Sequence, residues 1–283
     1  MGNVLYINKP AGISSFDVCF KLRRVLGTKK IGHTGTLDPN ATGVMVVLYE
    51  NGTKANQFLV TDTKEYIAKV KLGIETNTLD ITGEVIKEGK CIMPNKEVLE
   101  ECLNSFLGES KQVVPITSAV KVDGKRLYRY QLENKEVELP IRDINVYDIE
   151  LLDINEDSFT FRSKVSSGTY IRALMRDILA KLDLIGTLQE LERTYVDNIS
   201  IDECDKLEDV LNGNYTSHDV YDILKRKYVS YEVTNKEDII NGKRVKVESC
   251  EDKLLMVYEG SVLAMYQKDG NEYRCLRGLL WRK

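Results

Sequence analysis

The sequence predicts an α+β protein with a small β-rich domain at its carboxyl end. Helical and strand-like patterns alternate along residues 14–182. After about residue 228, short strand-like runs separated by Asn-Gly, Glu-Gly and Asp-Gly pairs replace them. The 283 residues, 42% of them hydrophobic, can bury a substantial core. We therefore expect two closely packed parts, residues 1–227 and residues 228–283.

Three segments have the pattern of amphipathic helices. Residues 14–27 begin with Ser14 and stop at Gly27, and residues 94–108 carry an apolar stripe at helical spacing. A third helix is expected from Tyr170 to about Leu182, with hydroxyl caps from the preceding Ser-Ser-Gly-Thr turn. Its apolar stripe leaves Arg172 and Arg176 on another face, and we expect one of them to point back at the sheet.

Strands are predicted at residues 44–49, 65–73 and 161–165. Residues 44–49 are a nearly all-apolar run, as in a buried strand. Residues 65–73 alternate, so Tyr66 should face the core together with Ala68, Val70 and Leu72. Residues 109–140 are expected to be basic and irregular. The carboxyl-terminal runs expected as strands are residues 244–247, 254–258 and 262–266.

Charge is unevenly distributed along the chain. The net charge of −4 argues against a nucleic-acid partner. However, residues 18–37 hold five Lys/Arg and no acid, residues 111–130 hold five against the single Asp123, and the tail from Tyr273 to Lys283 adds four. These stripes suit phosphate binding, and solvated helix faces are the alternative interpretation.

Composition also limits the location and the cofactors. No stretch reaches the roughly 18 apolar residues that cross a bilayer, and residues 1–10 lack the features of a secretion signal. The six cysteines are scattered without paired spacing, as in a reducing cytoplasm. With only His33 and His218 as further ligands, we expect no transition metal, whereas an Asp/Glu site for a hard cation stays open.

Residues 32–43 form a glycine-rich loop around Asp38-Pro39, directly before the strand at 44–49. The loop lacks the Gly-Lys-Ser/Thr of a P-loop and the spacing of a dinucleotide fingerprint. Its glycines would let the backbone approach a ligand while a turn presents Asp38. From the residues alone, however, Asp before Pro is far more often a turn starter than a catalyst.

A series of motifs covers nearly the whole chain. The most specific string is Gly32-His33-Thr34-Gly35-Thr36-Leu37-Asp38-Pro39-Asn40-Ala41-Thr42-Gly43. The others are residues 8–15, Lys64-Glu65-Tyr66, Leu72-Gly73, residues 76–83, 118–128 and 164–172. In their order and spacing these motifs resemble one family, the bacterial tRNA pseudouridine-55 synthases.

This resemblance implies a fold and a reaction. The fold would be a mixed, largely antiparallel sheet flanked by helices, the pseudouridine synthase fold, followed by a PUA-like domain. The reaction would isomerise uridine 55 in the tRNA T loop without cofactor, guide RNA or protein partner, in a chain expected to act as a monomer. The family's catalytic aspartate falls on Asp38, which either attacks C1′ or removes a C2′ proton; both roles need an ionised carboxylate.

The resemblance also assigns the surrounding residues. Arg172 would pair with Asp38. Tyr66 would stack on the flipped base, in a pocket completed by Tyr170 and Leu191. The remaining substrate-binding assignments are His33, which would enter the T loop, and Lys9 and Lys54, which together with an RNA-gripping insertion at about 108–140 would contact phosphates. Without the resemblance, the apolar and aromatic residues among these would be ordinary core residues.

The chain departs from the family pattern at three places. Glu192 stands before Arg193 where the family often has two arginines, which puts one phosphate contact in doubt. Thr117 replaces a usual tyrosine, and residues 131–135 lack the usual small residues. We expect none of these departures to touch the catalytic set.

Three alternative functions remain to be tested. A non-catalytic RNA-binding or tRNA-folding protein could use the same basic segments. A nucleosidase would need a second catalytic carboxylate, for which Asp80 is the nearest candidate, although we interpret it as structural. A guide-RNA-dependent relative fits less well, because the chain is short and lacks a long basic tail.

Overall fold

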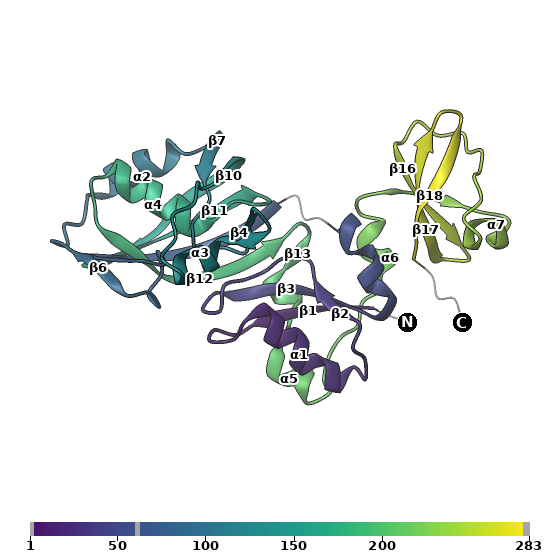
Figure 1. Cartoon of the computed structure of the whole chain (residues 1–283), viewed down its shortest axis with the longest axis horizontal. Helices are drawn as coiled ribbons and strands as arrows, with labels where there is room; N and C mark the ends of the chain where they lie inside the picture. The colour runs from purple at the N-terminus through teal and green to yellow at the C-terminus, as the bar shows by residue number, and fades with distance from the viewer. Residues whose placement is uncertain (1–2, 60–62, 280–283) are drawn as a thin grey trace.

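The computed structural model describes residues 3–59 and 63–279 (Figure 1). In these ranges the chain forms a ten-stranded mixed sheet, a four-stranded sheet at the carboxyl end and two short two-stranded ribbons. Helices cover the large sheet, so the predicted α+β class is confirmed. Residues 280–283 of the basic tail lie outside the described residues.

The element bounds are as follows. The large sheet contains β1 (Val4–Lys9), β2 (Ile31–His33), β3 (Thr42–Tyr49), β4 (Thr63–Leu72), β7 (Gly108–Val113), β10 (Ile141–Ile154), β11 (Ser158–Ser166), β12 (Gly186–Val196), β13 (Ile199–Ser200) and β14 (Asp205–Lys206). The ribbons are β5 (Ile74–Thr76) with β6 (Val85–Glu88), and β8 (Lys121–Val122) with β9 (Lys125–Arg126). The carboxyl-terminal sheet contains β15 (Val229–Glu232), β16 (Lys253–Tyr258), β17 (Ser261–Asp269) and β18 (Glu272–Gly278). The helices are α1 (Ser15–Val25), α2 (Lys96–Asn104), α3 (Leu127–Leu132), α4 (Ile171–Lys181), α5 (Leu207–Leu211), α6 (Val220–Leu224) and α7 (Lys236–Ile240), with 3-10 helices η1 (Glu50–Phe58) and η2 (Ile201–Glu203).

The large sheet joins two halves at a short parallel contact. Eight of its strands follow the order β14-β1-β3-β12-β4-β11-β10-β7, while β2 pairs with β3 and β13 with β12. All pairs except β1–β14 and β3–β12 are antiparallel. The β3–β12 contact consists of two residue pairs, Thr42 with Glu192 and Gly43 with Arg193. The loop at residues 34–41 leads directly into β3, so it lies at the junction of the halves.

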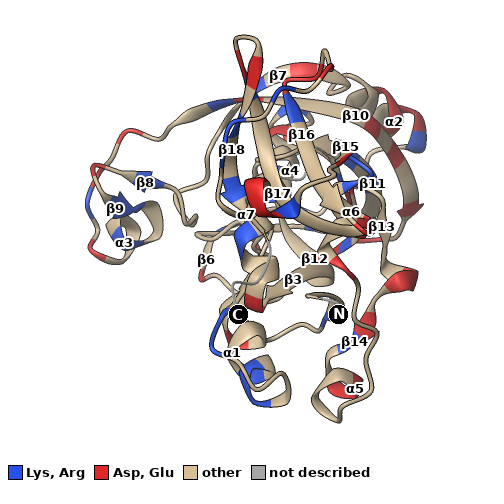
Figure 2. Ribbon diagram, turned by 90° about the vertical axis from the view of Figure 1, so that its right-hand side faces the viewer, with Lys and Arg blue, Asp and Glu red and all other residues tan. Residues whose placement is uncertain are grey.

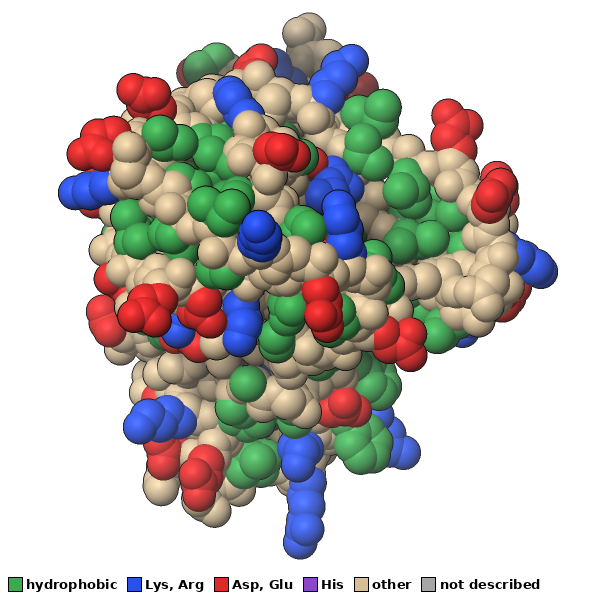
Figure 3. Space-filling model, turned by 90° about the vertical axis from the view of Figure 1, so that its left-hand side faces the viewer, with side chains coloured by type: hydrophobic (Ala, Val, Ile, Leu, Met, Phe, Trp, Pro, Cys, Tyr) green, Lys and Arg blue, Asp and Glu red, His purple; other side chains and the backbone are tan. Residues whose placement is uncertain are grey.

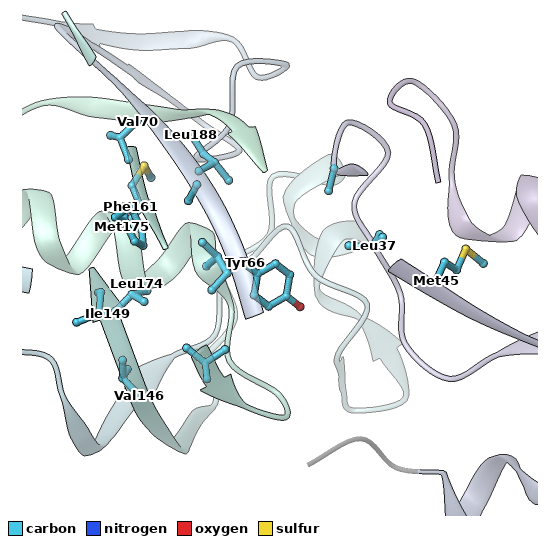
Figure 4. Close-up of a cluster of buried hydrophobic side chains, with 14 of the residues drawn as sticks. Leu37, Met45, Tyr66, Val70, Val146, Ile149, Phe161, Leu174, Met175 and Leu188 are labelled. Carbon is cyan, nitrogen blue, oxygen red and sulfur yellow. The ribbon is translucent and has the colours of Figure 1, made fainter. Parts of the chain in front are cut away.

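One face of the large sheet packs against helices. Buried residues of β1, β3, β4, β10 and β11 form a single cluster with residues of α1, α2, α4 and α5. As predicted, Tyr66, Ala68, Val70 and Leu72 of β4 all point into this cluster. Figure 4 shows Tyr66 within it, with the phenol oxygen on the side of Leu37.

The opposite face of β1 and β3 packs against the carboxyl-terminal part. Val4 and Tyr6 of β1 belong to a second cluster with residues of η1 and α6, and with Leu255, Val257 and Met265 of the four-stranded sheet. The other face of that sheet has a core of its own, which includes Met256 and Tyr266. The two parts therefore share one hydrophobic cluster.

Three sequence-based expectations about local structure were wrong. Residues 109–140 are not irregular throughout, because β7 is an edge strand of the large sheet, and β8, β9 and α3 form a lobe that projects from it (Figure 2). Residues 244–247 form only one isolated bridge, Val245 with Tyr273. The cap of α4 is Tyr170, without a side-chain cap from the Ser-Ser-Gly-Thr turn.

Within residues 3–59 and 63–279, no helix is both long and apolar enough to cross a membrane.

Candidate active site

Asp38 lies in a loop that the backbone and α1 hold in place. The amide of Ala41 donates to the carbonyl of Asp38 at 3.1 Å, which closes a tight turn at Asp38-Pro39. The Ser15 hydroxyl accepts from the Leu37 amide at 2.9 Å and donates to the Leu37 carbonyl at 3.1 Å. Ser15 therefore holds both backbone groups of Leu37, the residue before Asp38.

Lys9 fastens the same turn from β1. Its ammonium donates to the carbonyls of Pro39 at 2.9 Å and Pro10 at 2.8 Å, and the side chain is fully buried. Burial lowers the pKa of Lys9 to about 8, opposed by the charge of Asp38. The expectation that Lys9 contacts a phosphate is wrong, because its ammonium is enclosed and used within the protein.

Arg193 is a third support of the loop, a role that no pattern in the sequence indicated. Its guanidinium, 1% exposed, donates to the carbonyls of Val44 at 2.7 Å, Gly35 at 3.2 Å and Thr36 at 3.5 Å. Gly43 allows this approach: its φ is +100°, and an added Cβ would lie 2.1 Å from the Arg193 carbonyl oxygen. Arg193 thus holds the loop at the β3–β12 contact.

Arg172 and Asp38 form a bidentate ion pair. Arg172 Nε lies 2.9 Å from Asp38 Oδ2, and Nη2 lies 3.2 Å from Oδ1. The guanidinium is buried, with 5% of the side chain exposed, whereas 39% of the Asp38 side chain is exposed. Arg172 thus contacts a loop beside the sheet and not one of its strands. The carboxylate is therefore held by Arg172 on its buried side and accessible on its other side.

The rest of Arg172 is bound by two distant loops. Nη1 donates to Thr117 Oγ1 at 2.6 Å and to the Thr78 carbonyl at 3.0 Å, and Nη2 also donates to the Thr117 carbonyl at 2.9 Å. Together with the two bonds to Asp38, these use all five N–H donors of the guanidinium. The expectation that the departure at Thr117 leaves the catalytic set untouched is therefore wrong.

A cavity of about 840 Å³ opens above Asp38. Tyr66, Tyr170 and Leu191 line it, which brings together the residues that the resemblance assigned to the base pocket. Among the described lining residues, Asp38 is the sole carboxylate, and the basic residues are Lys64, Arg142 and Arg172. Its size suits a nucleotide, and its charge favours an anion.

Gln112 positions Tyr170 at the edge of this cavity. Its side-chain amide is buried, with Oε1 accepting from the Tyr170 amide at 2.9 Å and Nε2 donating to the Tyr170 carbonyl at 3.1 Å. These two bonds tie Tyr170, which precedes Arg172 by two residues at the start of α4, to β7. Sequence reasoning missed this residue, because a lone glutamine in a basic segment carries no distinguishing pattern.

His33 and Lys54 do not line the cavity. His33 ends β2, and its buried Nδ1 has no hydrogen-bond partner among the described residues; burial, and then the charge of Arg193, lowers its pKa. Lys54 lies in η1 and faces a second cavity of about 560 Å³ between the two parts of the chain, together with Lys30 and Arg277. Figure 2 shows further Lys and Arg residues along α1.

Asp80 has a structural environment. Its Oδ1 accepts from the Thr78 hydroxyl at 3.0 Å and from the amide and hydroxyl of Thr82, and the residue does not line the cavity. This carboxylate thus fixes the turn whose Thr78 carbonyl contacts Arg172.

The surface around the lobe is hollowed. Figure 3 shows hydrophobic side chains on the protruding lobe and on the body beside it, with basic side chains between them. Such a surface combines apolar and positively charged groups, both of which nucleic acids contact.

The chain is similar to known proteins of one family. The family described as TruB family pseudouridylate synthase (N terminal domain) matches residues 23–171. A protein of Clostridium tetani named tRNA pseudouridine synthase B is 39% identical over 272 residues, which are 95% of this chain and 93% of that protein. A protein of the same name from Fusobacterium nucleatum is 42% identical over 265 residues, with 91% and 92% covered.

Two solved structures share the fold. One is an H/ACA RNP bound to a substrate RNA containing 2′-deoxyuridine, at a TM-score of 0.73 and 19% identity over 99% of this chain and 86% of that chain. The other is a Cbf5-Nop10-Gar1 complex, at 0.73 and 20% identity over 99% and 85%. Because the family match covers more than half of the chain and the relatives more than nine-tenths, this protein belongs to the TruB family of pseudouridylate synthases.

Proposed function

We propose that this protein isomerises uridine 55 in the T loop of tRNA to pseudouridine, with Asp38 as the catalytic carboxylate. The observation that carries the proposal is the Asp38 carboxylate, open to a nucleotide-sized cavity and held by a fully bonded, buried Arg172. The relatives named tRNA pseudouridine synthase B supply the substrate class.

The cavity residues have separate roles in the proposed reaction. The base leaves the RNA stack and lies against Tyr66, with Tyr170 and Leu191 closing the pocket around it. Asp38, ionised beside Arg172, then attacks C1′ or removes the C2′ proton. The base detaches at N1, turns within the pocket and rejoins the ribose through C5. C5 then loses its proton, N1 gains one, and Asp38 is released in its starting form. No electrons are exchanged with another molecule, so we propose a reaction without cofactor or metal.

Basic surfaces outside the cavity would grip the tRNA. We assign catalysis to residues 1–227 and RNA binding to the insertion at about 108–140 and to the PUA-like part at 228–283. Lys54 faces a basic cavity between these parts and would contact a phosphate of the T arm. His33, at the end of β2, would enter the space that the flipped nucleotide leaves.

We further propose that the protein acts alone, as a cytoplasmic monomer that needs neither guide RNA nor protein partner. The six cysteines are unpaired thiols, as is usual in a reducing compartment. The relatives that support this proposal match the chain at nearly full length.

Two other functions predict different products. A nucleosidase would release free uracil, and the described cavity residues offer no second carboxylate for it. A purely RNA-binding protein would bind tRNA and leave every uridine unchanged, which does not explain the paired Asp38 and Arg172 inside a pocket.

The test is to incubate the purified protein with unmodified tRNA transcript, without guide RNA or added metal, and to map pseudouridine along the RNA. We expect pseudouridine at position 55 and no free uracil. Binding without any modified base would reject the proposed activity, and product only after addition of a guide RNA would reject independent action.

A further inference from the structure

The catalytic cavity contains two cations that the reaction described above does not use, Lys64 and Arg142. Lys64 lies in β4, two residues before Tyr66, so its side chain leaves the strand on the same face as that tyrosine. It lines the cavity together with Asp38 and Tyr66. Within the described ranges, no residue accepts a hydrogen bond from its ammonium or forms an ion pair with it. This ammonium is thus available to a ligand.

Arg193 is another cation close to Lys64. A Cβ built on Gly35 would be 3.7 Å from Lys64 Nζ and 3.5 Å from Arg193 Nη1, so both groups border the same point beside the catalytic loop. Burial, and then the charge of Arg193, lowers the pKa of Lys64 to about 8, although Asp197 opposes the shift. The positive charge of Lys64 is therefore poorly compensated within the protein.

Lys64 and Arg193 differ in what they bind. Arg193 donates to three backbone carbonyls and is enclosed by the protein. Lys64 has no such acceptors among the residues that the structure describes, although it carries three N–H donors. A partly buried charge without a partner is unfavourable, and such groups concentrate at sites where a ligand supplies the missing charge.

We propose that Lys64 binds a phosphate oxygen of the RNA backbone, next to the nucleotide whose base enters the cavity. This inference rests on the proposed function, because a polynucleotide places phosphates within one nucleotide of the sugar that meets Asp38. The ammonium would neutralise the phosphate, and the phosphate would complete the charge environment that the protein leaves open.

Binding measurements with three variants test the assignment. Lys64→Met removes the charge and keeps the length of the side chain, and Lys64→Arg keeps the charge. Lys69→Met is the matched control, because Lys69 lies in the same strand on the opposite face, 3.7 Å from Glu190. The dissociation constant for unmodified tRNA would be measured for each protein over a range of salt concentrations.

We expect Lys64→Met to weaken tRNA binding about tenfold, since it removes one charge-assisted hydrogen bond. The slope of log affinity against log salt should also fall by about 0.7–0.9, the value for one lost phosphate contact. Lys64→Arg should restore both quantities, and Lys69→Met should match the wild type. A drop in kcat with unchanged affinity and salt slope in Lys64→Met would overturn the assignment, because it would indicate a purely positioning role.

A modified RNA locates the contact. A T-arm hairpin would carry one neutral methylphosphonate, either 5′ or 3′ to the target uridine. At one of these positions the wild type should lose about tenfold in affinity, while Lys64→Met should lose nothing further. Equal losses in both proteins would overturn the assignment.

The proposed function can fail separately from this inference. If the wild type forms no pseudouridine, the proposed function and this inference are both rejected. If the wild type forms pseudouridine and Lys64→Met binds tRNA with the wild-type affinity and salt slope, only the phosphate assignment falls.

Discussion

Arg172 explains how a single residue can set the geometry of the Asp38 carboxylate, the proposed catalytic group. Its five donors meet five acceptors from three separated parts of the chain: Asp38, Thr117 and the turn at Thr78. A buried guanidinium that is fully bonded cannot rotate without breaking hydrogen bonds that water does not replace. The carboxylate is consequently presented to the cavity in one orientation.

Thr117→Val tests this network at the residue where the chain departs from its family. The substitution keeps the shape but leaves one buried N–H of Arg172 without its acceptor at 2.6 Å. We expect a loss of about 1–3 kcal/mol in the free energy of unfolding and a lower kcat with little change in tRNA affinity. Urea unfolding and single-turnover kinetics measure both effects. The control is Thr160→Val in β11, and equal behaviour of the two variants would contradict the account.

The pH dependence of stability tests the uncompensated charge of Lys64. Its folded pKa of about 8 lies below the ordinary value of 10.5, so the folded state loses this proton first as the pH rises. The penalty for charging Lys64 is therefore present below pH 8 and disappears between pH 8 and 10.5. Lys64→Met should stabilise the protein at pH 7, and this gain should shrink at pH 10. A pH-independent difference in urea unfolding between variant and wild type would contradict the prediction.

At the scale of elements, β7 controls where α4 begins. Gln112 replaces the side-chain cap that α4 lacks by bonding both backbone groups of Tyr170. Gln112→Leu removes the acceptor of the Tyr170 amide, whereas the Tyr170 carbonyl keeps its bond from the Leu174 amide at 3.0 Å. For this one unpaired amide we expect a loss of about 1–3 kcal/mol in stability. Because Arg172 follows two residues later, kcat should fall as well. The control is Gln131→Leu, which removes a hydrogen bond from Gln131 in the lobe to the carbonyl of Asn77. An equal loss of kcat in this variant would argue against a specific role of β7.

Elements with a regular pattern were predictable from the sequence, and elements with interrupted patterns were not. The helices α1, α2 and α4 and the strands β3, β4 and β11 follow their periodicities closely. In β10 and β12, register shifts break the alternation, at Val146/Asp148 and Leu151/Asp153 and at Leu188/Glu190 and Arg193/Tyr195. Strand β1 is buried on both faces and so shows no alternation at all.

The resemblance to the family made it possible to predict the Asp38–Arg172 pair and the meeting of Tyr66, Tyr170 and Leu191 at one cavity. The supporting residues were not predictable. Arg193 contacts residues about 150 positions away, and Gln112 contacts Tyr170 across 58 positions. Polar residues are usually exposed, so a polar residue that distant parts of the chain bury is predicted from the sequence to lie on the surface. Lys9 was misinterpreted for the same reason.

At the scale of the whole molecule, the shared hydrophobic cluster couples the two parts. Leu255 and Met256 are neighbours in β16, both fully buried, yet Leu255 faces the shared cluster and Met256 faces the separate core. Each substitution by alanine should cost about 2–5 kcal/mol. We expect Leu255→Ala to split thermal unfolding into two calorimetric transitions, whereas Met256→Ala should shift the unfolding of the carboxyl-terminal part. Identical calorimetric profiles for the two variants would show that the cluster does not couple them.

The central claim is that Asp38 performs the isomerisation. The most direct measurement compares wild type and Asp38→Asn in the rate of pseudouridine formation at position 55 under single-turnover conditions, together with the affinity for tRNA. The substitution keeps the size of the side chain and removes its negative charge. The account predicts a rate lower by about 10²–10⁴-fold or more, with tRNA affinity within a few-fold of wild type. Product formation by Asp38→Asn at the wild-type rate would contradict it.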